Sequence, residues 1–235
     1  MYNENGHLDE NLRLELYMNQ SQNVRNLLKT KKIFIKDINE TNRIGKDREL
    51  KVKTNLLALL YCTYAEAVLY QIVLTPYGIT KSQIEDIDNE SSVGTIWKKL
   101  INIGFKMIPN YANSNDLKQR EGFIINFIDD FIVPPSLIRN KMMHGQWVVA
   151  LNRNRTKLNN ETTINIDNLD YVKIGTWFKS LETVSKIVRE LIQSPTKGFH
   201  NSYWPLYLRV REDIEKSKNW TYLSKRNLLK NKPKK

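Results

Sequence analysis

Arg139, Asn140 and His144 form the one group of neighbouring residues in this chain whose types suggest chemistry as well as packing. They lie within residues 134–147, which read Pro-Pro-Ser-Leu-Ile-Arg-Asn-Lys-Met-Met-His-Gly-Gln-Trp. A guanidinium can hold phosphate oxygens and stabilise developing negative charge, and an imidazole can transfer protons near neutral pH. The group therefore predicts an anion site, and with a bound phosphodiester it could support phosphoryl transfer.

A short helix must position these residues. Pro134 and Pro135 suit the first turn of a helix, and Gly145 suits the left-handed position just past its end. Five residues of helix turn by roughly 140° and rise by roughly 7.5 Å, so Arg139 must reach round to approach His144. The alternative is purely structural, because His is a good C-terminal capping residue and Arg139 could be a surface cation.

The pattern Arg139-Asn140-x-x-x-His144 resembles the R-[N/H/K]-x-x-x-H motif of the HEPN superfamily (higher eukaryote and prokaryote nucleotide-binding domains). Gly145 after the His and the aliphatic pair at 137–138 also resemble that group. The resemblance implies a small all-α domain and metal-independent endoribonuclease activity in toxin–antitoxin, abortive-infection or antiviral defence systems. The motif covers six residues, and support from the rest of the chain is architectural only. Gln146 stands where HEPN toxins partnered by nucleotidyltransferases carry a Tyr, so control by modification of that Tyr is not expected.

The resemblance also implies roles for individual residues. His144 would transfer protons, Arg139 would stabilise the phosphorane-like charge, and Asn140 and Glu66 would support them. The RNA's own 2′-hydroxyl would attack the adjacent phosphate, leaving a 2′,3′-cyclic phosphate and a 5′-hydroxyl. A homodimer, or a pair with another HEPN domain, is expected to form a composite site, with a possible antitoxin or defence-system partner and no cofactor. The alternatives are a non-catalytic RNA- or nucleotide-binding module and a helical interaction scaffold.

Glu66 is the single carboxylate in the middle of the most apolar segment, Arg48 to Leu74, which predicts a helix buried on most sides. A buried carboxylate needs a partner. In HEPN proteins a polar residue from an early helix often faces the Arg and His, so the resemblance makes Glu66 a candidate to pair with Arg139 or to orient His144. It could equally pair with another cation or lie on a small exposed strip. The stretch 56–74 is long enough to span a membrane, but its polar residues favour a core helix, and no membrane partner is expected.

Beyond the motif, Gln146 to Asn152 alternates loosely and could pair with Thr162 to Ile166 as a β-hairpin. Its tip would then carry Arg153, Arg155 and Lys157, which with Lys141 are the predicted contacts to the RNA backbone. A soluble, mobile loop is the equal alternative.

The fold class predicted from these patterns is all-α, a HEPN-like helical bundle with a small β-hairpin inserted after the motif helix. We expect an N-terminal helix and linker over 1–45, the helical domain over 46–218 and a basic C-terminal tail over 219–235. Apolar spacing predicts the helices. They are expected at 8–30, 48–74, from Ser91 or Ser92 to Pro109, at 116–131, 168–193 and 203–216. Residues 29–53 are interpreted as a loop or irregular link.

The composition of the chain indicates which classes of partner and cofactor to expect. The net charge of +12 favours a polyanionic partner, for which RNA, DNA and an anionic membrane surface all qualify, although lysine-rich solubility is the simpler interpretation. One cysteine and three well-separated histidines predict neither a disulfide nor a metal site. Nothing at the start of the chain is typical of an export signal, so a cytoplasmic location is expected. The basic tail carries Trp220 and Tyr222, which could stack on unpaired bases, or it could be a frayed end.

Overall fold

The computed structural model describes residues 9–232 and contains no β-strand within them, which confirms the all-α class. Leu8 of the expected first helix and Lys234 and Lys235 of the expected tail lie outside these residues. The helices are α1 (Glu10–Ile44), α2 (Asp47–Val73), α3 (Lys81–Asp88), α4 (Val93–Lys106), α5 (Asn115–Phe131), α6 (Val133–Met143), α7 (Asn160–Asp167), α8 (Tyr171–Gln193), α9 (Gly198–Ser217) and α10 (Tyr222–Lys230), with a 3-10 turn at Tyr111–Asn113.

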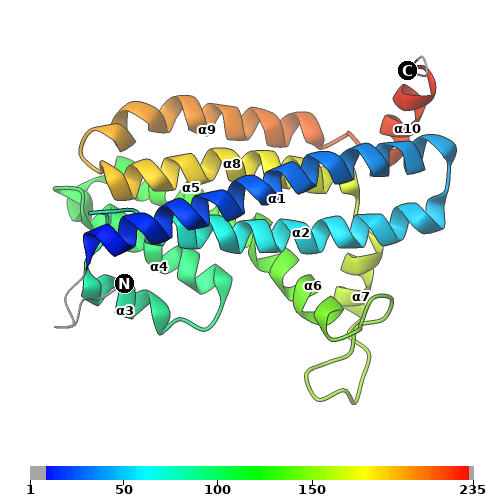
Figure 1. The fold of residues 1–235 in the computed structure, drawn as a ribbon, viewed down its shortest axis with the longest axis horizontal. Helices are drawn as coiled ribbons and strands as arrows, with labels where there is room; N and C mark the ends of the chain where they lie inside the picture. Colours follow the sequence, from blue (N-terminus) through cyan, green and yellow to red (C-terminus); the bar gives the residue numbers. More distant parts are fainter. Residues whose placement is uncertain (1–8, 233–235) are drawn as a thin grey trace.

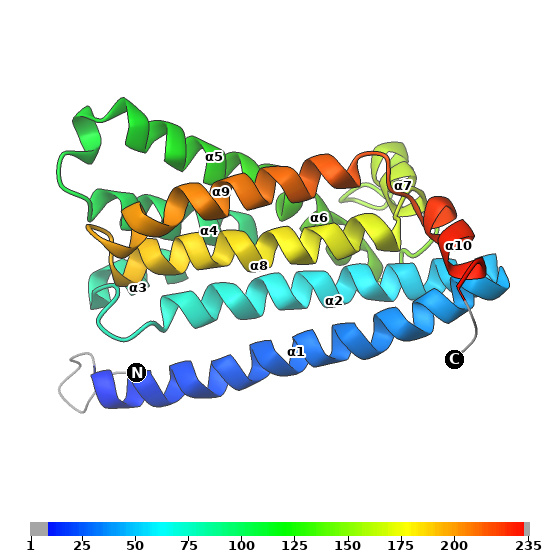
Figure 2. The ribbon, with the colours of Figure 1, turned by 90° about the horizontal axis from the view of Figure 1, so that it is seen from above.

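Four long helices form the body of the molecule. In Figure 2, α1, α2, α8 and α9 lie side by side in that order, and α6 and α7 project from one side of this body in Figure 1. The core contains fully buried residues of α2 and α8, including Leu57, Tyr61, Phe178 and Leu181. An 18-residue segment of α2 has a mean hydropathy of 1.6, so by length and composition alone α2 could cross a membrane. However, 67% of this segment is buried inside the protein, as in the core helix of a soluble bundle.

The predicted link at residues 29–53 is wrong, because α1 continues through it to Ile44. Half-buried Phe34 and Ile35 and buried Ile38 extend the apolar face of α1 against α2. The helix ends only at Gly45, whose φ of 77° is left-handed. The N-terminal segment therefore shares one core with the rest of the bundle.

The predicted β-hairpin is also wrong. Residues 162–166, expected as its second strand, belong to α7, whose N-cap Asn159 accepts a hydrogen bond from the Thr162 amide. Leu151 and Leu158 form an isolated bridge, and no longer ladder connects the described residues. Capping by Asn159 satisfies one of the first helical N–H groups, so the local hydrogen bonds favour a helix over the strand that the alternation indicated.

The expected basic tail folds as α10 and packs where α1 ends and α2 and α8 begin. Buried Asn42 donates to the Tyr222 carbonyl at 2.9 Å and accepts from Arg226 Nε at 2.9 Å. Asp170 accepts a hydrogen bond from the Tyr222 amide at 3.0 Å. These polar anchors hold α10 against α1 and α8, as Figure 2 shows at the end of the bundle.

Candidate functional site

Helix α6 has the bounds that its end signals predict. Pro134 and Pro135 lie in its first turn, and His144 is its C-terminal cap. Gly145 follows with φ of 79°; its amide donates to Met142 O at 3.0 Å, and the Gln146 amide donates to Lys141 O at 3.0 Å. These paired bonds satisfy the last carbonyls of the helix. The motif helix therefore ends at His144.

Arg139 and Glu66 lie together, as one of the two sequence expectations for Glu66 predicts. Arg139 Nη2 donates to Glu66 Oε2 at 3.3 Å, and Arg139 Nη1 donates to Asn140 Oδ1 at 3.3 Å. The Arg139 and Glu66 side chains are 38% and 36% exposed. A single, half-exposed contact of this kind contributes little to stability, about 0.5 kcal/mol or less, and leaves the remaining guanidinium N–H groups for an anion.

A cavity of about 380 Å³ opens beside this pair. It lies between α2, the start of α4 and α6, and Arg139, Asn140 and Glu66 all line it. Sequence reasoning did not place the other polar lining residues in a site: Tyr70, Glu90, Ser91, Ser92 and Ser136. Tyr70 follows Glu66 by four residues and Ser136 precedes Arg139 by three, so helical spacing could have indicated both, whereas Glu90 reaches the cavity only through tertiary packing.

Close packing of α4 on α6 sets the shape of this cavity. A Cβ atom added at Gly94 would lie 2.7 Å from Val133 Cγ2, so only glycine lets the two helices approach this closely. The Tyr61 hydroxyl donates to Phe131 O at 2.7 Å and ties α2 to the end of α5, immediately before α6. The position of Arg139 on α6 relative to Glu66 on α2 thus depends on α4 and α5 as well.

His144 lies apart from this cavity. It is exposed and does not line the cavity, and its side chain has no hydrogen-bond partner among residues 9–232. The structure therefore brings Arg139, Asn140 and Glu66 together, and within one chain it does not bring His144 into the same cavity.

Lys141 supports the loop that follows the motif. Its Nζ donates to the Leu151 carbonyl, and the Gln146 side chain accepts from the Leu151 amide at 2.7 Å. Ile138 and Met142 from α6 pack with Ala150 and Ile166 in a small apolar cluster. Lys141 was expected to contact RNA, but its ammonium group is already engaged by this backbone.

Arg153, Arg155 and Lys157 are exposed on the turn that follows. The Asn152 side chain organises this turn by accepting from the amides of Thr156 at 2.9 Å and Lys157 at 3.3 Å. Arg155 has φ of 57°, a left-handed conformation that non-glycine residues adopt rarely. The three cations therefore project from one ordered turn beyond α6.

Burial controls the chemistry of the nearby thiol. Cys62 lies one helical turn before Glu66 on α2, and its burial raises the pKa of the thiol from 9.0 to about 12. This group is therefore protonated at neutral pH and is a poor nucleophile. Within residues 9–232, no group of three or more His, Cys, Asp or Glu side chains is placed to hold a metal ion.

The site is thus a half-exposed guanidinium, oriented by a carboxylate and an amide, next to a helix end that carries an exposed imidazole. The guanidinium can bind an anion, and the imidazole at the end of the same helix is a proton-transfer group that lies outside the cavity. Comparison of the chain with protein-family models, curated proteins and solved structures gives no match.

Proposed function

We propose that this protein is a HEPN-type endoribonuclease that cleaves RNA without a metal ion. The observation that carries the proposal is the Arg139 guanidinium, held by Glu66 Oε2 at 3.3 Å beside a cavity and borne on the same helix that His144 caps. The oxygen of the RNA's 2′-hydroxyl attacks the adjacent phosphorus, the bond from phosphorus to the 5′-oxygen breaks, and the net proton transfer is from the 2′-oxygen to the 5′-oxygen. Arg139 stabilises the charge on the non-bridging oxygens, and His144 takes part in the proton transfer.

A homodimer completes the site in this proposal. His144 is exposed outside the Arg139 cavity, so the two groups need a second copy of the chain to form one reaction centre. Apolar side chains around them are exposed, with Leu137 at 59%, Met143 at 66% and Val148 at 78%. Burial of this surface in a dimer would remove apolar area from water and exclude water from the reacting phosphate.

Cations near the motif provide the RNA contacts in this proposal. Arg153, Arg155 and Lys157 on the ordered turn after α6 are free to bind backbone phosphates, and the net charge of +12 favours a polyanion. The activity would be cytoplasmic and would belong to a toxin, abortive-infection or antiviral defence system with its own restraining partner.

The test is cleavage of labelled single-stranded and transfer RNA in EDTA by the wild type, Arg139→Ala and His144→Ala. Lys36→Ala, an exposed change on α1, is the matched surface control. We expect cyclic-phosphate ends from the wild type and the control, and losses of 100-fold or more in the two motif variants. Activity that survives in both motif variants would place the reaction elsewhere.

The dimer is tested separately with Leu137→Glu and Val148→Glu. Each change places a charge on the exposed apolar surface, so we expect monomers by sedimentation and loss of cleavage with a normal fold. Full activity in a monomeric variant would overturn the composite site.

A non-catalytic RNA-binding module is the second candidate, and the exposed, unpartnered His144 side chain is the observation that favours it. In that case the wild type binds RNA but leaves it intact, and only Arg139→Ala weakens binding. Absence of cleavage by pure, dimeric wild type with RNA affinity retained would select this candidate.

A further inference from the structure

A second hollow, which the proposed RNA site does not use, lies across α2 from the Arg139 cavity. It is a groove of about 450 Å³ between α1 and α8, and α2 forms its floor. Figure 2 shows α2 lying between α1 and α8. Tyr64, Val68 and Gln71 of α2 line this groove, whereas Glu66 and Tyr70 line the Arg139 cavity. The two hollows therefore use different faces of one helix.

Polar bridges cross both ends of this groove. At one end Lys31 Nζ of α1 lies 3.0 Å from Glu182 Oε1 of α8. At the other end Arg189 Nη2 donates to Gln71 Oε1 at 2.8 Å, and Gln71 Nε2 donates to Ser21 Oγ at 2.7 Å. Residues 182 and 189 are about 10 Å apart along α8, which fits a small molecule better than a strand of RNA passing through.

The groove has an excess of positive charge. Arg25, Lys186 and Arg189 line it, and Glu182, its one lining carboxylate, is already paired with Lys31. None of the three cations lies within ion-pair distance of a carboxylate among residues 9–232. Arg189 Nε is enclosed without an acceptor. Arg189 as a whole is half-buried, and Arg25 and Lys186 are exposed, so a bound anion would supply the counter-charge that the partly enclosed guanidinium lacks.

Apolar side chains complete the groove. Val24 and Leu28 of α1 and Val68 of α2 line it together with the buried ring of Tyr64. A volume of this size with an apolar wall and a few convergent polar groups is typical of small-molecule sites. We propose that the groove binds a small phosphorylated organic molecule, with its phosphate held by Arg25, Lys186 and Arg189 and its organic part against Val24 and Leu28. This site is independent of RNA cleavage.

Titration calorimetry of the full chain tests the proposal with two probes, inorganic pyrophosphate and adenosine 5′-diphosphate. We expect saturable binding of both, with the organic probe at least threefold tighter because it also contacts the apolar wall. Arg25→Gln and Lys186→Gln change exposed residues and should fold normally, and we expect each to weaken binding at least tenfold. Lys36→Gln is the matched control on α1, outside the groove, and should leave binding unchanged.

Each contrary result overturns a stated part of the proposal. No saturation by either probe at millimolar concentration excludes the site. If Lys36→Gln weakens probe binding as much as the groove variants do, the probes are attracted by the basic surface in general and not by the groove. Equal affinity for the two probes would show that the groove does not recognise the organic part of the ligand. If short single-stranded RNA displaces the organic probe, and the Arg25→Gln and Lys186→Gln variants weaken this RNA binding, the groove is an RNA site instead.

Discussion

Glu66 Oε2 of α2 lies 3.3 Å from Arg139 Nη2 of α6, and this contact joins the buried central helix to the motif helix. Both side chains are more than one-third exposed, so the contact orients Arg139 more than it stabilises the fold. The same guanidinium donates to Asn140, which fixes its plane between two acceptors. Under the proposed function, the RNA phosphate would therefore meet a guanidinium that is already oriented.

The first prediction concerns Glu66 as a positioning residue. Glu66→Gln keeps an acceptor for Arg139, and Glu66→Ala removes it. We expect unfolding free energies within about 1 kcal/mol of the wild type for both variants, because the ion pair is half-exposed. Under the proposed function, RNA cleavage should fall about tenfold in Glu66→Ala, mainly in kcat, and recover most of that loss in Glu66→Gln. Equal losses in the two variants would show that Glu66 acts through its charge, and unchanged kcat in both would leave it without a role.

The second prediction concerns the approach of α4 to α6. Gly94→Ala would place its Cβ 2.7 Å from Val133 Cγ2, so the helices must separate at the cavity wall. We expect a loss of about 1–3 kcal/mol in unfolding free energy, measured by urea titration. Gly122→Ala in α5 is the control, since nothing lies within 4 Å of its added Cβ, and it should be neutral or stabilising by about 0.5–1 kcal/mol. An unchanged unfolding free energy in Gly94→Ala would mean that the Val133 side chain moves aside easily and does not fix the distance between α4 and α6 at the cavity.

The bounds of α6 could be predicted because its end signals are local. The prolines, the motif and Gly145 lie within one short stretch, and each acts on its own turn of the helix. The contact between Glu66 and Arg139 was one of two equal expectations: the apolar helix singles out Glu66, but Arg139 is indicated as its partner only by the HEPN resemblance, and Glu66 is more than one-third exposed. The position of His144 outside the cavity could not be predicted, because it depends on the rotation of the last turn of α6 and on the residues that pack around that turn.

The errors have physical causes as well. Charged and amide side chains on the exposed face of α1 obscure the apolar spacing that runs through Phe34 and Ile38, so the helix was expected to stop early. In residues 162–166 the alternation indicates a strand, but the cap at Asn159 makes a helix. α10 depends on buried Asn42, a partner 180 residues from Tyr222 that no local pattern reveals.

The third prediction concerns Cys62. Folding raises the pKa of its thiol from 9.0 to about 12 through burial, so the native thiolate fraction at pH 8 is lower by about 1000-fold. Alkylation by iodoacetamide should accordingly be very slow in the native protein and should keep rising between pH 9 and 12. In guanidinium-unfolded protein the rate should be fast and level off above about pH 9. A native rate that levels off near pH 9 would show that the thiol is solvated.

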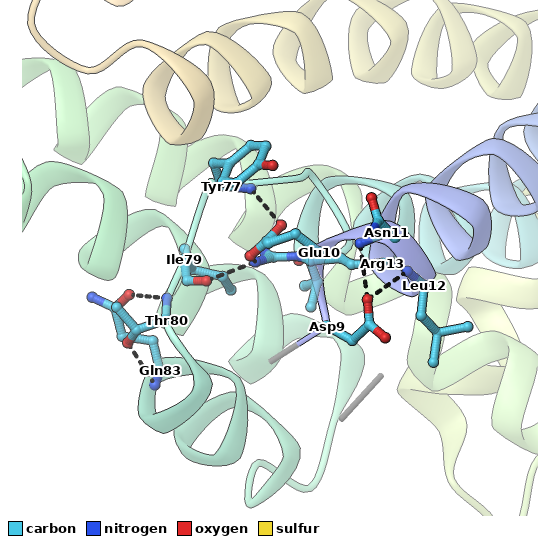
Figure 3. Close-up of polar contacts among 10 residues, drawn as sticks. Asp9, Glu10, Asn11, Leu12, Arg13, Tyr77, Ile79, Thr80 and Gln83 are labelled. Atoms are coloured by element: carbon cyan, nitrogen blue, oxygen red, sulfur yellow. Dashed lines mark hydrogen bonds and ion pairs between the residues drawn. The ribbon is translucent and has the colours of Figure 1, made fainter. Parts of the chain in front are cut away.

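The fourth prediction concerns Arg13, which is fully buried near the start of α1. Its Nη2 donates to Val73 O at the end of α2 at 2.9 Å, and its Nη1 donates to Ile79 O at 2.9 Å. Figure 3 shows the Nη1 contact together with Glu10, which pairs with Arg13 at 3.3 Å and accepts from the Tyr77 amide. One side chain thus fastens α1 to the chain segment after α2.

Replacement of Arg13 by Met keeps much of its length and removes its donors. Two buried carbonyls then lack partners, so we expect the unfolding free energy to fall by about 3 kcal/mol in urea titrations. Lys29→Met, an exposed change on the same helix, should stay within about 0.5 kcal/mol of the wild type. Hydrogen exchange should also quicken first at the ends of α1 and α2 that Arg13 joins, because local opening follows the loss of local contacts. If Arg13→Met is as stable as Lys29→Met, water or neighbouring groups can replace the hydrogen bonds of the Arg13 side chain. In that case apolar packing alone holds the first turns of α1.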